Sequence, residues 1–189
     1  MLRHIKQAGC YAIAYGVESA SQEILDTLNK DITLDQAEEA VRLSQEVGLQ
    51  TIGYFMIGSP GESPETIRQT IDLAKKLKLD FAQFAVTIPF PGTKLYDLYL
   101  DGRKDNNISW ESFVYTRSGT DRAPVFESSL VKRDDIQYWT RRAYREFYLR
   151  LSYLWQRIRH TTSIGDLNVG VKGLSTLLRN IKPTPKGRE

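Results

Sequence analysis

The sequence predicts an α/β fold, a partial TIM-type (β/α) barrel segment with parallel strands, followed by an α-helical C-terminal extension. Between residues 10 and 88, three short apolar runs alternate with segments whose apolar residues recur at helical spacing. Residues 133–160 contain neither Gly nor Pro and keep helical spacing throughout. Strands that alternate with helices form βαβ units, so we expect a parallel sheet with right-handed crossovers. From this alternation alone, a doubly wound sheet and a barrel segment both stay open.

The chain begins with the end of a helix and then a strand. We expect residues 2–8 to be the last helical turns, closed by Gly9, because glycine readily takes the left-handed conformation that follows a helix. A start so near a helix end indicates that a preceding segment is lost. An apolar strand is expected over 10–17, with Cys10 as a small core residue at its buried start. Glu18 and Ser19 stand at the carboxyl end of this strand.

Two helices are predicted before the second strand. Ser19 or Ser21 can cap the first one. Thr33 and Gln36 form a capping-box pattern for the second, and Gly48 ends it. The apolar residues that should face inward are Ile24, Leu25 and Leu28 in the first helix, and Ala37, Ala40, Val41 and Val47 in the second.

The second strand and its turn are the stretch around which we expect the chain to be organised. The apolar run 52–57 is short and ends at Gly58, which favours a strand buried on both faces. Ser63 is a good helix N-cap, Pro64 suits the first helical position, and Glu65 favours the positive end of the helix dipole. A junction of strand, turn and capped helix is where α/β folds bind ligands.

Downstream we expect a helix over 63–78, a third strand over 81–88, a short helix over 95–100 and an irregular segment over 108–128. Residues 133–160 should form one long helix or two stacked ones. We divide the chain into residues 1–115, the barrel part, and residues 116–189, a basic helical extension with a disordered tail over 182–189.

Charge separates the two parts of the chain. Residues 1–131 hold 13 basic and 18 acidic residues, whereas residues 132–189 hold 13 basic and 5 acidic ones. The simplest interpretation of the basic helical surface is a solvated face, and contact with an anionic membrane or another domain stays open. No nucleic-acid partner is expected, because Arg and aromatic residues alone fit no binding module.

A single cysteine excludes an internal disulfide and suits a reducing compartment. No apolar run is long enough for a membrane span, and the N-terminus does not have the pattern of a secretory signal. We therefore expect a cytoplasmic protein.

Two carboxylates follow consecutive predicted strands, where barrel active sites lie. Glu18 and Glu62 could each act as general acid or base, bind ligand hydroxyls, or close a loop by accepting backbone N–H bonds. The turn 58–61 could cradle a phosphate, although it lacks the Lys and Ser/Thr of a P-loop. His4 and His160 are isolated in the sequence, so no metal site is expected.

Four motifs carry a family resemblance: residues 16–19, 28–30, 53–66 and 88–96. In this order and spacing they resemble the C-terminal half of a radical S-adenosylmethionine (SAM) core domain. The resemblance covers residues 1 to about 100 and is closest to members with an N-terminal cobalamin-binding domain, a group that includes the anaerobic magnesium-protoporphyrin monomethyl ester cyclases. The aromatic, Arg-rich helix resembles that group's C-terminal extension.

The resemblance implies that the three strands are the fourth to sixth of a partial (β/α)6 barrel. In such enzymes a [4Fe-4S] cluster reduces SAM to a 5′-deoxyadenosyl radical. The implied SAM contacts are Glu18 and Ser19 at the ribose or amino-acid end, Met56, Ile57, Gly58 and Glu62 beside the adenine, and Val86, Thr87 and Ile88 at the adenine edge. Met56 stands where Ile is usual, and the Pro-Gly turn adds a residue.

One departure is large: the CxxxCxxC motif that binds the cluster is absent. The resemblance therefore places the cluster ligands outside this chain, with cobalamin a further candidate cofactor of the full-length protein. A fragment, a separately encoded half and a degenerate relative are all compatible with this. We favour a fragment that is inactive without the other half of the barrel. The full enzyme is expected to act on a small-molecule substrate.

The catalytic residues stay unassigned, and two alternative functions stay open. One is a cofactor-free α/β enzyme that uses Glu18 and Glu62 as an acid/base pair. The other is a non-catalytic relative whose basic C-terminal part binds a partner or a membrane.

Overall fold

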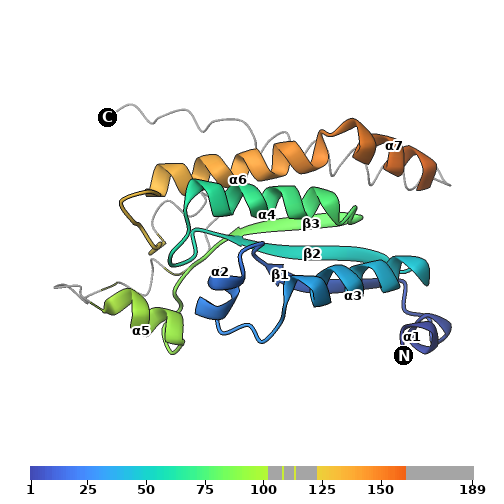
Figure 1. Cartoon of the computed structure of the whole chain (residues 1–189), viewed down its shortest axis with the longest axis horizontal. Coiled ribbons are helices and arrows are strands. Elements are labelled where there is room, and N and C mark those ends of the chain that lie inside the picture. Colours follow the sequence, from blue (N-terminus) through green and yellow to red (C-terminus); the bar gives the residue numbers. More distant parts are fainter. Residues whose placement is uncertain (102–107, 109–112, 114–122, 161–189) are drawn as a thin grey trace. The chain divides into compact units, whose positions relative to one another are not determined.

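A computed structural model describes residues 1–101, 108, 113 and 123–160. In chain order the elements are α1 (Leu2–Gln7), β1 (Ala12–Glu18), α2 (Gln22–Thr27), α3 (Leu34–Glu46), β2 (Gln50–Ile57), α4 (Pro64–Lys76), β3 (Phe81–Val86), α5 (Lys94–Leu100), α6 (Arg133–Tyr148) and α7 (Leu151–His160) (Figure 1). The chain divides into two compact units, residues 1–140 and 141–189, and the division falls within α6.

The first unit contains a three-stranded parallel sheet. The strands lie in the order β1-β2-β3, with Ala14 beside Ile52 and Ile52 beside Phe81. The predicted parallel α/β segment is therefore confirmed, and so is the helical part that follows it. Residues 133–160 form two helices, with a break at Leu149 and Arg150.

Only one face of the sheet is buried among the described residues. Along β2 the side chains alternate, with Thr51 and Phe55 buried while Gln50 and Tyr54 are exposed. Our prediction that this strand is buried on both faces is wrong. Parallel sheets usually carry helices on both faces, but here the described helices that pack on the sheet cover the Phe55 side.

Helix α3 shows which face is covered. The Tyr15 hydroxyl of β1 lies 2.7 Å from the Ser44 hydroxyl, and the Gln45 amide donates to the Thr51 hydroxyl at 3.2 Å. Both strand residues belong to the buried face. The opposite side, which we call the open face, presents the residues that alternate with them: Ala14, Gly16, Ile52, Tyr54, Met56, Gln83 and Ala85.

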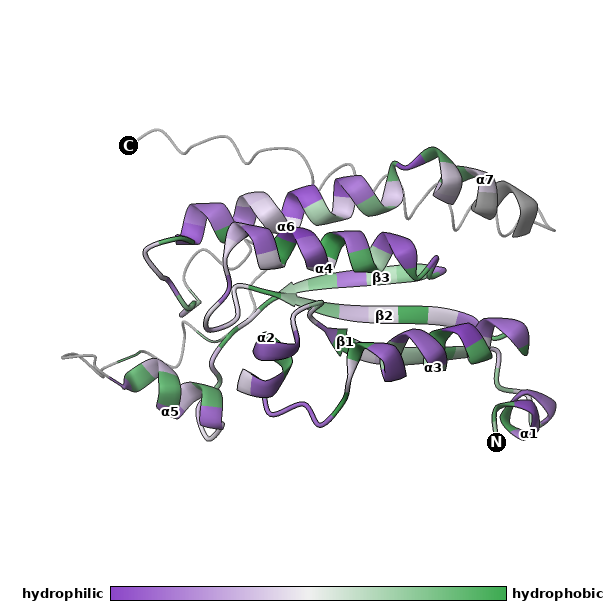
Figure 2. Ribbon diagram, viewed as in Figure 1, coloured by the Kyte–Doolittle hydropathy of each residue, from purple (hydrophilic) through white to green (hydrophobic). Residues whose placement is uncertain are grey.

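The helix caps follow the sequence patterns. Thr33 and Gln36 form the predicted capping box of α3, while Ser63 and Thr66 form one at α4 with Pro64 in the first turn. Apolar and polar segments alternate along both helices, as Figure 2 shows.

The inward stripe of α3 is partly as predicted. Ala37 and Val41 are buried, but Ala40 and Val47 are only half-buried. The stripe instead continues through Ser44, because its hydroxyl bonds both Tyr15 and the Ala40 carbonyl.

Aromatic side chains pack against each other on the buried face of the sheet. The rings of Phe55 and Phe84 stack at a centroid distance of 5.3 Å on neighbouring strands. A Cβ atom on Gly53 would lie 2.5 Å from Leu79 Cδ1 and 2.8 Å from the Phe55 ring, so a larger residue there would require these side chains to shift.

No helix among the described residues has both the length and the apolar character needed to cross a bilayer.

Candidate functional site

The end of β1 has an unusual backbone. Glu18 has a φ of 63°, a left-handed conformation that is uncommon for residues other than glycine. The pairing with β2 also shifts register between Gly16 and Glu18. Such a conformation costs on the order of 1 kcal/mol and persists only where its surroundings enforce it, which makes it a marker of function.

This backbone directs the Glu18 carboxylate over the open face. A Cβ atom on Gly16 would lie only 2.6 Å from Glu18 Oε1, so the carboxylate lies where a side chain at position 16 would be. Glu18 Oε1 also pairs with Lys30 Nζ at 2.8 Å, and the Glu18 side chain is 13% exposed. The result is an ion pair on the open face, at the carboxyl edge of the sheet.

Lys30 is the site residue that we did not predict from the sequence. It follows Asn29, which has a φ of 55° just after α2 and turns the chain back toward the sheet. Residues 28–30 were among the motifs of the family resemblance, and their fixed distance from Glu18 was the available signal. The sequence alone does not show that the two charges meet.

Ser19 has a different environment. It is fully buried; its hydroxyl accepts a hydrogen bond from Ser21 N at 3.1 Å and lies 3.3 Å from the Thr70 hydroxyl of α4. These bonds tie the end of β1 to α4. Ser21, rather than Ser19, is the N-cap of α2, because its side chain accepts from Ile24 N.

Glu62 closes the turn after β2. One oxygen, Oε2, accepts hydrogen bonds from Gly58 N at 2.5 Å and Ser59 N at 2.9 Å, and the residue is only 3% exposed. The other oxygen is buried with no partner among the described residues. Burial raises the pKa of Glu62 to about 7, and the two amide hydrogen bonds oppose this shift. Glu62 therefore belongs to the interior of its own loop.

The ends of β2 and β3 are joined by hydrogen bonds. Thr87 N donates to the Ile57 carbonyl at 2.9 Å, and the hydroxyls of Ser59 and Thr87 share a bond of 2.9 Å. The Thr87 side chain is fully buried, as is that of Ile57. Gly58, with a φ of 84°, packs where a Cβ would lie 2.9 Å from Ile136 Cδ1.

The remaining predicted residues, Met56, Val86 and Ile88, are half-buried. The structure thus brings all nine predicted positions to the ends of three neighbouring parallel strands. Among their side chains, those of Glu18 and Met56 lie on the open face, whereas Ser19, Ile57, Glu62 and Thr87 point into the packing.

A metal cluster does not fit these residues. No group of three or more His, Cys, Asp or Glu that could hold a metal ion occurs in the part of the chain that the structure describes. Cys10 is half-buried, and its thiol donates to the Ala12 carbonyl at 3.1 Å. Our prediction of a buried core position is wrong, because β1 begins only at Ala12.

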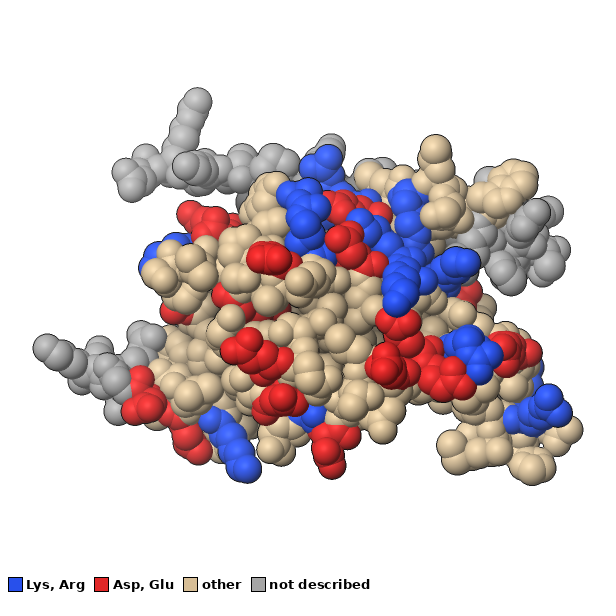
Figure 3. Space-filling model, viewed as in Figure 1, with Lys and Arg blue, Asp and Glu red and all other residues tan. Residues whose placement is uncertain are grey.

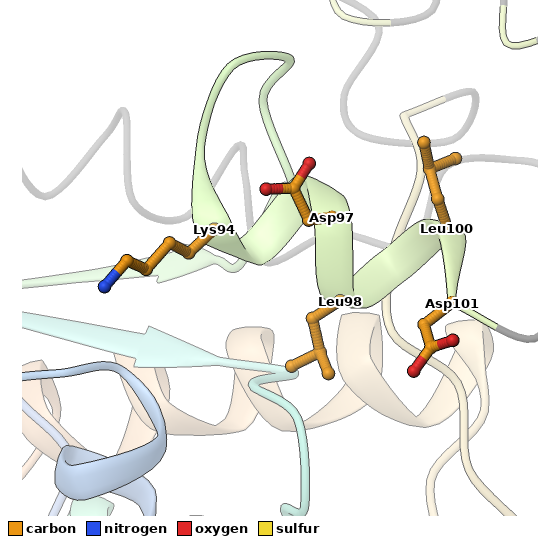
Figure 4. Close-up of a pocket in the computed structure, with 5 residues that line it drawn as sticks. All are labelled: Lys94, Asp97, Leu98, Leu100 and Asp101. Atoms are coloured by element: carbon orange, nitrogen blue, oxygen red, sulfur yellow. The ribbon is translucent and has the colours of Figure 1, made fainter.

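A surface hollow lies elsewhere, along α5. Its lining residues are Lys94, Asp97, Leu98, Leu100 and Asp101, and the hollow is open to solvent. Their side chains point in different directions rather than toward one point (Figure 4). None of the predicted site residues lines it.

Comparison with known proteins identifies the region that contains the Glu18–Lys30 pair. Residues 1–74 match the Radical SAM superfamily. This segment is similar to part of a radical SAM domain. Within this radical SAM segment lie β1, β2 and most of α4, so the family resemblance drawn from the sequence motifs is confirmed.

Curated relatives extend the similarity beyond this segment. The chain is 36% identical over 146 residues to an uncharacterised methyltransferase of Pyrococcus horikoshii, a match that covers 77% of this chain and 30% of the relative. It is 28% identical over 159 residues to the anaerobic magnesium-protoporphyrin IX monomethyl ester cyclase of Cereibacter sphaeroides, covering 82% of this chain and 25% of the cyclase. The chain thus spans less than a third of these relatives.

Among solved structures, the chain is similar to the radical SAM methyltransferase TsrM of Kitasatospora setae, solved with cobalamin and a [4Fe-4S] cluster. The TM-score is 0.48 at 25% identity, over 56% of this chain and 22% of TsrM.

Proposed function

We propose that this chain binds SAM at the carboxyl edge of its sheet, as part of a radical SAM enzyme. The observation that carries the proposal is the Glu18–Lys30 ion pair. Its acidic member has a left-handed backbone and lies over Gly16 on the open face. The pair lies within the radical SAM segment, and backbone strain of this kind clusters at ligand sites.

The two side chains fit the polar groups of SAM. A carboxylate such as that of Glu18 accepts hydrogen bonds from ribose hydroxyls or from an ammonium group, and Lys30 can donate to the SAM carboxylate. Because the Glu18 side chain is only 13% exposed, such bonds would be made in a partly desolvated place and be stronger than in water.

The other predicted residues would act through their main chain. Ile57, Gly58 and Thr87 are buried, so an adenine at this edge would meet the peptide groups of residues 56–58 and 86–88. Glu62 supports this edge by holding the amides of Gly58 and Ser59 in place. The roles of all nine positions in SAM binding are part of this proposal.

The cluster is assigned to another part of the protein. The described residues do not fit it, and the relatives are more than three times as long as the matched segment. Beside such a cluster, bound SAM supplies a radical or a methyl group. We propose that residues 1–115 form the barrel part and pair with a segment that supplies three thiolates; the boundary at 115 lies outside the described residues.

The cofactor, substrate and location of the full enzyme are also part of the proposal. TsrM binds cobalamin, which makes this cofactor part of the proposal for the full enzyme. The substrate is proposed to be a small molecule. A cytoplasmic location remains a proposal and rests on the single cysteine.

An acid/base pair without a cofactor is less consistent with the geometry. Glu62 is 3% exposed and bonded to its own loop, so its carboxyl does not reach a substrate on the open face. Glu18 is held in an ion pair with Lys30.

SAM titration tests the proposal directly. In the cluster-loaded protein that contains this chain, Glu18→Gln should weaken SAM affinity by roughly 10-fold to 150-fold, because a charge-assisted hydrogen bond contributes about 1.5–3 kcal/mol. Calorimetry should give unchanged affinity for Glu23→Gln, an exposed acid in the first turn of α2. SAM affinity unchanged in Glu18→Gln would overturn the proposal.

A further inference from the structure

The packing of the second unit is centred on aromatic side chains. The ring of Phe147, which is fully buried, lies 4.8 Å from that of Tyr148 and 5.4 Å from that of Tyr153. The guanidinium of Arg150 lies 4.1 Å from the centroid of the Phe147 ring. These contacts fix the start of α7 against the end of α6.

A second set of apolar side chains is exposed to solvent. Leu151, Leu154 and Trp155 are 83%, 38% and 57% exposed, and Leu149 beside them is 43% exposed. The first three have the spacing i, i+3, i+4, so they share one side of α7. We call Leu149, Leu151, Leu154 and Trp155 the apolar ridge. Tyr153, in contrast, is buried and packs against the rings of Phe147 and Tyr148.

The sequence around the ridge is strongly basic. Residues 141–160 contain six Arg and one acidic residue, Glu146. That carboxylate is already bonded to Arg142 at 2.6 Å. Arg145 is exposed, and no ion pair within the described residues involves it. In the space-filling view, Lys and Arg side chains lie over α6 and α4, with Asp and Glu side chains among them (Figure 3).

We propose that the apolar ridge binds the surface of a bilayer that contains anionic lipids, with α7 lying in the plane of the interface. Exposed Leu and Trp on one side of a helix, with Arg near them, are the pattern of interfacial helices. A specific protein interface buries about 800 Å² on each partner, more than four side chains on a helix of about three turns provide. The positive charge selects the anionic surface.

Vesicle flotation of the 189-residue chain tests this proposal. At low salt the chain should bind vesicles of phosphatidylglycerol and phosphatidylcholine, and should bind pure phosphatidylcholine much more weakly. Replacing Leu151, Leu154 and Trp155 together by Ser should lower the partition coefficient about 1000-fold, since each replacement loses about 10-fold. Arg145→Gln should lower it about 5-fold, and the loss should shrink at high salt.

Matched control variants distinguish vesicle binding through the apolar ridge from nonspecific adsorption. Leu130→Ser removes an apolar side chain that is 63% exposed, and Arg3→Gln removes an exposed charge, both in the first unit. Neither should change vesicle binding. Equal retention of wild type and triple variant, or binding independent of lipid charge, would overturn the proposal. So would vesicle binding that Leu130→Ser weakens as much as the triple variant does.

Discussion

The buried carboxyl of Glu62 should make stability depend on pH with a sign opposite to that of most carboxyls in folded proteins. Its pKa in the folded state is about 7, because burial raises it from the ordinary carboxyl value of 4.5. Between these two values the folded chain therefore holds a proton that the unfolded chain has lost. Stability from this group is present below about pH 4.5 and is lost as pH rises through about 7.

Glu62→Gln removes the titration while keeping the shape. The amide oxygen of Gln can still accept from Gly58 N and Ser59 N, and the side chain is neutral at every pH. Each pKa unit corresponds to about 1.4 kcal/mol, so between pH 5 and 8 the variant should gain roughly 2–3 kcal/mol of stability relative to wild type. Any constant cost of burying the amide NH2 cancels when the two pH values are compared.

Urea unfolding of both proteins at pH 5 and pH 8 measures this difference. Glu65→Gln is the matched control, because it makes the same substitution at an exposed position in the first turn of the same helix. If wild type instead became more stable than Glu62→Gln as pH rises, the two amide hydrogen bonds would outweigh burial. The folded loop would then favour the charged form of Glu62 over the protonated form.

Three further changes test the local geometry. Glu18→Gly should raise stability by about 1 kcal/mol in thermal unfolding, since glycine takes a φ of 63° without strain. Glu18→Gln should not raise it. Equal melting temperatures of the two variants would argue against strain at this residue. Gly58→Ala should cost at least about 2 kcal/mol in urea unfolding, because the new methyl meets Ile136 at a positive φ, and a neutral result would contradict the packing. Ser63→Ala should cost about 1 kcal/mol by removing the cap of α4, and a cost near zero would show that water replaces it.

Local patterns predicted most of the sheet part of this chain. The boundaries of β2 and α4 follow from Gly58 and from the cap at Ser63, because turn and cap chemistry acts over a few residues. The parallel pairing followed from the alternation of strands and helices. The burial of only one face of β2 did not follow, because an apolar run has the same sequence pattern whether one or both faces of the strand are covered.

The candidate site shows the same division between local and non-local information. Glu18 was placed correctly at a strand end, because this depends on its position in the chain. Its partner Lys30 was not predicted, since their contact depends on how α2 returns to the sheet. The sequence left three roles open for Glu62. The amide hydrogen bonds from Gly58 and Ser59 show loop closure, which only three-dimensional contacts could reveal.

The order of the strands has a consequence for how the chain folds. Each strand pairs with the next one along the chain: Ala12 with Gln50, 38 residues later, and Ile52 with Phe81, 29 residues later. No pairing within this sheet waits for a distant segment, so the entropic cost of closing each loop is modest. The sheet can therefore grow by one βα unit at a time as the chain leaves the ribosome. The amides of β2, which is bonded along both edges, would be the last to exchange with solvent deuterium.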